Sequence, residues 1–244
     1  MAINQQPVII LVGTQMGENI GMCARAMLNC GLERLRLVSP RDGWPNPAAI
    51  ATAADADIVL ENAECFDSVA DAVADCHRVF ATTARERALN LPVLGADGAA
   101  AEIKGVSGEN RQPAILFGPE ASGLDAASLE SVDTLIHIDT NPEFSSLNLA
   151  QAVLLIGWEL RKTSSVSQAG ESEKSEGETA GKKDLEFFLQ RLESTLEEKK
   201  FFLTPDLKPT TVRNLRAMFQ RIAPSDKELK MLHGMLTALA KTGD

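Results

Sequence analysis

IDTNPEFSSLNLAQAV, at residues 138–153, is the stretch of sequence that decides the fold. It follows a short apolar run, contains a turn-forming Asn141-Pro142 pair and two serines, and then places apolar residues at helical spacing. This pattern predicts a strand, a tight loop and a helix, with Ser145 or Ser146 as the helix N-cap. Such a loop presents free backbone N–H groups at the positive end of a helix, and an ordinary capped helix would have the same pattern.

Two further loops have the same character and also follow apolar, strand-like runs. LFGPEASGL, at residues 116–124, overlaps the end of the run at 113–117. GTQMGENIGMCARAM, at residues 13–27, follows VIILV at residues 8–12. Ligands of open parallel α/β sheets bind at the carboxyl ends of the strands, so these loops mark the expected ligand-binding edge.

Alternating strand-like and helix-like segments fill residues 7–162. The expected strands are residues 8–12, 34–38, 57–60, 78–81, 114–117 and 135–138. Amphipathic segments lie between them, such as residues 20–29, which Gly31 closes, and residues 66–74. This rhythm predicts an α/β fold with a mostly parallel sheet covered by helices on both faces.

The C-terminal third has a different composition. Residues 163–182 are rich in Ser, Glu and Gly, and we expect them to form a flexible linker. Three apolar stripes at helical spacing follow and predict a small all-helical C-terminal extension. The expected helix caps there are Thr210 or Thr211, and Ser225 with Glu228. The expected domains are therefore residues 1–162 and 183–244, joined by the linker.

The charge pattern leaves the kind of partner open. A net charge of −10 and an estimated pI of 4.9 argue against a general nucleic-acid binder. Residues 200–230 are nevertheless locally basic, which suits either a solvated helix face or a face that contacts RNA. The chain has no apolar run long enough to span a bilayer and no basic, cleavable leader, so we expect a cytoplasmic protein.

The sequence lacks the residue patterns that several common kinds of functional site require. The cysteines and histidines show no metal-ligand spacing, so we expect no metal and reduced thiols. Gly13, Gly17 and Gly21 do not match the dinucleotide fingerprint, and no acidic residue follows the second expected strand. Neither the P-loop nor the nucleophile-elbow motif occurs.

Three motifs in order resemble those of the SpoU/TrmH family of RNA 2′-O-ribose methyltransferases, which belong to the SPOUT class. They are NIGMCARAM at residues 19–27, ILFGPEASGL at 115–124 and IHIDTNPEFSSLNLAQAV at 136–153. The resemblance covers residues 7–162. The extension, with NLRAMFQR and ELKMLHGML, resembles the TrmJ branch of this family, whose members methylate the ribose of pyrimidine 32 in the tRNA anticodon loop.

The resemblance implies a deep C-terminal trefoil knot in the catalytic domain, S-adenosyl-L-methionine as the cofactor, tRNA as the partner, and a homodimer. By motif position, the implied cofactor contacts are Thr82, Thr83, Ala84, Gly118, Ile138, Ser145, Ser146 and Leu147. The implied catalytic residues are Asn19, Arg25, Glu120, Ser146 and Asn148. Pro119 departs from relatives that carry a basic or other polar residue before the glutamate, and we expect it to alter how this loop meets RNA without abolishing cofactor binding.

Arg25 matches the arginine that the family is proposed to use in deprotonating the ribose 2′-hydroxyl. A guanidinium stays protonated at neutral pH and is a poor base, so a charged arginine that stabilises the developing alkoxide fits this position equally well. In a dimer, Arg25 of one subunit would complete the site of the other. Trp158 and the apolar stripe at residues 149–160 suit either that interface or the chain's own core.

Three other functions remain open for the sequence. The chain could methylate another RNA such as ribosomal RNA, bind RNA without catalysis, or be a nucleotide-binding metabolic enzyme of plain doubly wound topology. We also expect Arg85 and Arg87, just after the expected cofactor loop, to bind tRNA phosphates.

Overall fold

The computed structural model describes residues 6–83, 91–109, 111–120, 122–166, 179–202, 204 and 207–241. The chain divides into two compact units, Met1–Glu171 and Ser172–Asp244. The first carries all of the strands in the described residues, and the second is helical. No helix in these ranges combines the length and apolarity needed to cross a bilayer.

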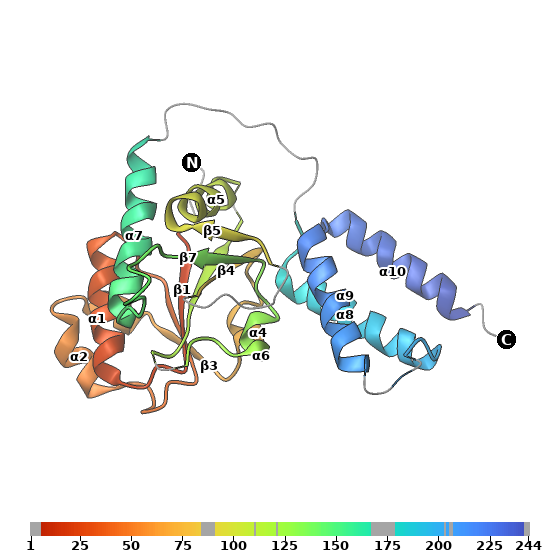
Figure 1. The fold of residues 1–244 in the computed structure, drawn as a ribbon, viewed down its shortest axis with the longest axis horizontal. Helices are drawn as coiled ribbons and strands as arrows, with labels where there is room; N and C mark the ends of the chain where they lie inside the picture. Colours follow the sequence, from red (N-terminus) through yellow and green to blue (C-terminus); the bar gives the residue numbers. More distant parts are fainter. Residues whose placement is uncertain are drawn as a thin grey trace. The chain divides into compact units, whose positions relative to one another are not determined.

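A seven-stranded, all-parallel sheet forms the centre of the first unit (Figure 1). Its strands are β1 Val8–Val12, β2 Leu35–Val38, β3 Glu64–Phe66, β4 Arg78–Thr82, β5 Val93–Gly95, β6 Pro113–Phe117 and β7 Thr134–His137. Their spatial order is β3-β2-β1-β6-β4-β7-β5. The predicted α/β class with a parallel sheet is therefore confirmed.

Helices cover both faces of this sheet, as the apolar strands require. They are α1 Gly17–Asn29, α2 Pro47–Ala53, α3 Asp57–Glu61, α4 Val69–Ala72, α5 Ala96–Gly108, α6 Ala126–Leu129 and α7 Leu149–Val166. The side chains of β1 alternate between two cores: Ile9 and Leu11 pack with α1, α5 and α7, and Val8 and Ile10 pack with α4 and α6.

Two glycines let helices pack closely behind the sheet. A Cβ built on Gly21 in α1 would lie 2.0 Å from the carbonyl oxygen of Ala49 in α2. A Cβ on Gly157 in α7 would lie 3.0 Å from the side chain of Cys30, just after α1. These close contacts set the position of α1, the helix that carries the first motif.

The strand predicted at residues 57–60 is wrong, because this segment forms helix α3. Asp57 lies in its first turn, and Val59 and Leu60 are buried on one side while Ile58 is exposed. A run of three apolar residues, Ile58 to Leu60, fits a strand or one helical turn equally well. The neighbouring strand is β3, three residues further on.

The second unit is a three-helix bundle of α8 Lys182–Glu198, α9 Lys208–Ile222 and α10 Asp226–Lys241. Its core includes Leu185, Phe188 and Leu236. The capping box predicted for α10 is confirmed, since the Ser225 N–H and hydroxyl donate to Glu228 at 2.7 and 2.8 Å. The predicted threonine cap of α9 is wrong, because that helix begins without a side-chain cap and has a proline in its first turn.

Part of the basic surface predicted for the extension is neutralised within the bundle. Arg216 pairs with Glu186 and Glu193, and Lys208 pairs with Glu197. The unpaired positive charge of this unit is therefore smaller than the sequence count indicates. The linker and the domain boundaries remain predictions; α7 continues to Val166, and α8 begins at Lys182.

The trefoil knot also remains a prediction. The order of the strands does not define how the chain is threaded, so the sheet topology does not test the knot.

Arg36 links the sheet to the loop after α4. Its guanidinium donates to both carboxylate oxygens of Asp75, at 2.5 and 2.8 Å, and to Glu64 at 3.1 Å. The hydrogen bond from Arg36 lowers the pKa of Asp75. The pair therefore stabilises the fold fully above the unfolded-state pKa of about 3.9, and this contribution is lost as the pH falls through the lowered folded pKa.

We predict that Asp75→Asn lowers the free energy of unfolding at neutral pH by no more than about 1 kcal/mol, because the Asp75 side chain is 55% exposed and solvent screens the pair. Urea unfolding of both proteins at several pH values measures this. The difference should shrink as the pH is lowered from about 4. A difference that stays constant down to the acid unfolding limit would contradict the assignment.

Candidate functional site: a cavity at the carboxyl edge of the sheet

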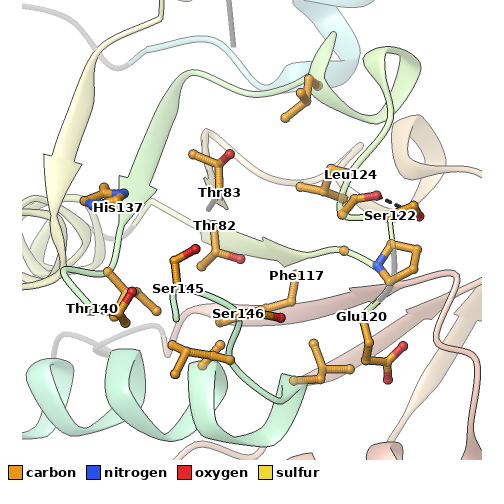
Figure 2. Close-up of a pocket in the computed structure, with 18 residues that line it drawn as sticks. Thr82, Thr83, Phe117, Glu120, Ser122, Leu124, His137, Thr140, Ser145 and Ser146 are labelled. Atoms are coloured by element: carbon orange, nitrogen blue, oxygen red, sulfur yellow. Dashed lines mark hydrogen bonds between the residues drawn. The ribbon is translucent and has the colours of Figure 1, made fainter. Parts of the chain in front are cut away.

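A cavity of about 340 Å³ lies beyond the carboxyl ends of β4, β6 and β7. Of the sequence-predicted residues, those that line it are Thr82, Thr83, Gly118, Glu120, Ile138, Ser145, Ser146 and Leu147. In Figure 2, the threonines at the end of β4 and the serines before α7 reach toward the same space. Ala84, Arg85 and Arg87 lie outside the described residues.

Sequence reasoning missed part of the lining. The apolar additions are Phe117, Leu124, Leu129, Leu149 and Ala152, and the polar additions include Ser122, His137 and Thr140. His137 and Thr140 flank the predicted contact Ile138 on either side, so their closeness in the chain was the only available signal. Apolar walls with a few hydroxyl groups suit a small molecule of mixed polarity.

Gly118 lies where the chain turns back toward β6. A Cβ on Gly118 would approach the Leu124 backbone nitrogen to 2.4 Å and the Gly123 carbonyl carbon to 2.7 Å. The Gly123 N–H donates to the Pro119 carbonyl at 2.8 Å, which closes this turn. Only glycine fits at position 118, and the residues that follow it can therefore fold back over the cavity.

One hydrogen-bonded group joins the three motifs. Asn19 in α1 donates through Nδ2 to Oε1 of Glu120, and Asn148 donates through Nδ2 to Oδ1 of Asn19 at 3.4 Å. Asn19 is 5% exposed. Glu120 also lines the cavity, so this group connects the first motif to the cavity wall. We call it the Asn19–Glu120–Asn148 group.

One of the two carboxylate oxygens of Glu120 is buried in the protein interior. Its Oε2 atom is buried and has no hydrogen-bond partner in the described residues. Burial, and secondarily the charge of Glu120, raises the pKa of the Cys23 thiol. Cys23 is thus a neutral packing residue, and the inaccessible Oε2 suits Glu120 as a positioning group rather than as a base for an incoming substrate.

The N-cap of α7 differs from the prediction. Asn148, not Ser145 or Ser146, accepts the N–H of Ala150 at 2.9 Å, and Gln151 accepts the N–H of Asn148 at 3.0 Å. The helix therefore begins at Leu149, three residues beyond the second serine. Both serines stay in the loop, where they line the cavity instead of capping the helix.

Arg25 lies apart from this cavity. It is exposed on α1 between the buried residues Ala24 and Ala26, and it is not among the residues that line the cavity. Within the described part of the chain it makes no hydrogen bond or ion pair. No group of three His, Cys, Asp or Glu side chains that could hold a metal occurs in the described residues.

We predict that Asn19→Ala breaks the hydrogen bonds that link the three motifs. It removes the donor to Glu120 and leaves that carboxylate largely buried and unpaired, which costs about 1–3 kcal/mol of unfolding free energy. The midpoint temperature of thermal unfolding and the activity of the site should both fall. Asn29→Ala, at an exposed position of the same helix, is the control and should change neither. Equal behaviour of the two variants would show that the group is not needed.

The parallel sheet, the cavity lined by the second and third motifs at its carboxyl edge, and the first motif hydrogen-bonded to that wall through Asn19 define a SpoU-type methyltransferase catalytic domain. The model of the SpoU rRNA Methylase family matches residues 6–158, and the chain belongs to this family of enzymes. A second model, the C-terminal domain of tRNA methyltransferase TrmJ, matches residues 183–244.

Similar proteins cover nearly the whole chain. The crystal structure of TrmJ from Z. mobilis ZM4 is 42% identical, with a TM-score of 0.85, and the match covers 96% of this chain and 99% of that one. A tRNA (cytidine/uridine-2′-O-)-methyltransferase TrmJ from Pectobacterium atrosepticum is 38% identical over 97% of each chain. A Pseudomonas aeruginosa relative, named for cytidine, uridine and adenosine, is 33% identical over 96% of this chain and 93% of its own.

Proposed function

We propose that the protein transfers a methyl group from S-adenosyl-L-methionine to the ribose 2′-hydroxyl of cytidine or uridine in tRNA, at position 32 of the anticodon loop. The observation that carries this is a cavity lined by residues of the second and third motifs, to which Asn19 of the first motif is hydrogen-bonded through Glu120 and Asn148. Relatives named as tRNA 2′-O-methyltransferases, similar over nearly the whole chain, support the tRNA substrate.

The cavity residues fit the proposed cofactor. Ile138 and Leu147 offer apolar walls to an adenine ring, and the hydroxyls of Thr82, Ser145 and Ser146 offer hydrogen bonds to the polar parts. The Gly118 turn, which leaves no space for a Cβ, lets backbone groups approach the bound molecule. S-adenosylmethionine supplies a methyl group on a positively charged sulfur.

The chain's own residues then have two tasks in the transfer. The first is positioning, since the Asn19–Glu120–Asn148 group fixes the loops that hold the donor and the ribose in line. The second is charge stabilisation at the 2′-oxygen as its proton leaves. Arg25, held charged, donates hydrogen bonds to that oxygen or to the neighbouring phosphate, and the proton passes to solvent.

The exposed position of Arg25 supports a homodimer with shared sites. Arg25 does not line the cavity of its own chain, so in this proposal it reaches the cavity of the partner. An apolar surface suits the contact: Met22 in α1 and Leu154, Leu155 and Trp158 in α7 are 37–53% exposed. We place the enzyme in the cytoplasm with its tRNA substrate.

Position 34 of tRNA is an alternative to position 32 as the methylated nucleotide. A solved structure on 2-OH methylation of C/U34 on tRNA is 25% identical, with a TM-score of 0.52, and covers 66% of this chain. The match at residues 183–244 to the TrmJ C-terminal domain supports position 32, because the resemblance to the TrmJ branch implies that position and the C/U34 structure leaves a third of this chain uncovered.

Two measurements test the proposal together. Calorimetric titration of S-adenosylhomocysteine into the purified protein should give micromolar binding. Labelled S-adenosylmethionine should then methylate unmodified tRNA, and nucleoside mass spectrometry should locate the methyl group at position 32. Methylation of ribosomal RNA alone would show that ribosomal RNA, and not tRNA, is the substrate. Absence of cofactor binding would refute the methyltransferase site.

A further inference from the structure

One aromatic side chain, on the residue that precedes two residues of the cavity lining, is largely exposed to solvent. Phe144 is 77% exposed, the highest value among the large hydrophobic residues that the structure describes. It makes no aromatic contact among the rings described there. An isolated exposed apolar residue is common, so exposure alone decides nothing.

The position of Phe144 is more informative than its exposure. It directly precedes Ser145 and Ser146, which line the cavity, and consecutive Cα atoms are about 3.8 Å apart. The turn before it is ordered by hydrogen bonds: the Phe144 N–H donates to the Asn141 carbonyl at 2.9 Å, and the Glu143 N–H donates to the Asn141 side chain at 3.0 Å. The backbone therefore holds an exposed ring on the residue next in the chain to two residues of the cavity lining, where the proposed function puts the methyl donor.

An RNA acceptor would bring a flat partner to this ring. The ribose carbon that bears the 2′-oxygen is bonded to the carbon that bears the base, so the base lies within one sugar ring of the reacting oxygen. Proteins recognise single-stranded RNA loops by stacking exposed bases on aromatic side chains. A ring beside the cavity is suitably placed for that contact.

We propose that Phe144 stacks on the base of the nucleotide whose ribose is methylated. The inference rests on the proposed function and adds the way in which the base is recognised. Every base has a π-face, so stacking binds bases without distinguishing them strongly. This agrees with the relatives' names, which combine cytidine and uridine and, in Pseudomonas aeruginosa, adenosine, on a common ribose chemistry.

Three proteins test this: wild type, Phe144→Leu, which stays apolar but loses the flat ring, and Phe144→Trp, which keeps a ring. A stacking contact that is equally strong before transfer and in the transition state contributes to tRNA binding and not to the rate of the chemical step. KM for tRNA should therefore rise about tenfold in Phe144→Leu, with kcat changed little. Phe144→Trp should keep a KM near the wild-type value. Ile58→Ala, at an exposed apolar residue of α3, controls for a general loss of apolar surface.

A stacking contact also has a spectroscopic signature. The indole of Phe144→Trp should lose fluorescence when tRNA binds, beyond the change that wild type shows with Trp44 and Trp158. Affinity for S-adenosylhomocysteine should be equal in all variants, because the ring does not line the cavity.

The outcomes separate the two proposals. Wild-type protein that binds the cofactor but does not methylate tRNA would overturn the proposed function. Wild-type activity on tRNA with an unchanged KM in Phe144→Leu would overturn the stacking contact alone. A change of oligomeric state in Phe144→Leu, measured by light scattering, would also overturn it and assign the ring to a protein interface.

Discussion

Arg25→Ala should lower kcat for methyl transfer by about 10²–10³-fold, the loss typical of removing one donor that stabilises a developing oxyanion. Arg25 is exposed on α1 and does not line its own cavity, so folding and the affinity for S-adenosylhomocysteine should stay at wild-type values. Single-turnover rates and calorimetry measure the two quantities. A parallel loss of cofactor affinity would place Arg25 in the donor site instead.

Mixed dimers determine which subunit supplies Arg25. Two differently tagged chains, one with Arg25→Ala and one with Gly118→Ala, are co-expressed and purified by both tags. If sites are shared, the intact cavity of the first chain receives Arg25 from the second, and about half of the wild-type rate returns. If each chain uses its own Arg25, both sites are defective and the mixed dimer stays inactive.

Gly118→Ala should abolish binding of the methyl donor. The new Cβ would lie 2.4 Å from the Leu124 nitrogen, so the turn that closes the cavity must move. A displacement of about 1 Å can cost about 10²-fold in function, and we expect a loss of at least about that size in affinity for S-adenosylhomocysteine. Calorimetric titration measures this, and overpacking should also lower the unfolding free energy by about 1–3 kcal/mol.

A second glycine provides the matched control. Gly105 lies in helix α5, and a Cβ built there meets nothing within 4 Å. Gly105→Ala should therefore leave cofactor binding unchanged and stabilise the protein by up to about 1 kcal/mol, because alanine favours the helix. Equal binding by the two variants would show that the Gly118 turn tolerates a side chain.

Much of the sheet was predictable because its strands are short, apolar and separated by amphipathic segments. β1 has the predicted bounds, and β4, β6 and β7 differ by one residue at their ends. The wrong strand at residues 57–60 shows the limit, since burial of Val59 and Leu60 against other helices decides between helix and strand. β5 was missed because its three residues, VLG, are too short to give a periodic signal, and helix α5, which follows it, was not predicted either.

The sequence indicated which residues belong to the candidate site, but not how these residues contact one another. The motifs placed Gly118, Ser145 and Ser146 at one edge, and the structure brings them around one cavity. The bond between Asn19 and Glu120 joins residues 101 positions apart, which no local pattern indicates. The cap of α7 was misassigned because Asn148 competes with the serines, and the chain geometry decides which side chain reaches the first free N–H.

The pairing of β1 with β6 has a consequence for the newly made chain on the ribosome. Val8 pairs with Ala114, so the first strand made must wait for a neighbour synthesised about a hundred residues later. At about 5–20 residues per second, that delay is about 5–20 s. During this interval the apolar strand VIILV has one edge unpaired, and chaperones that bind exposed hydrophobic segments have time to act on it.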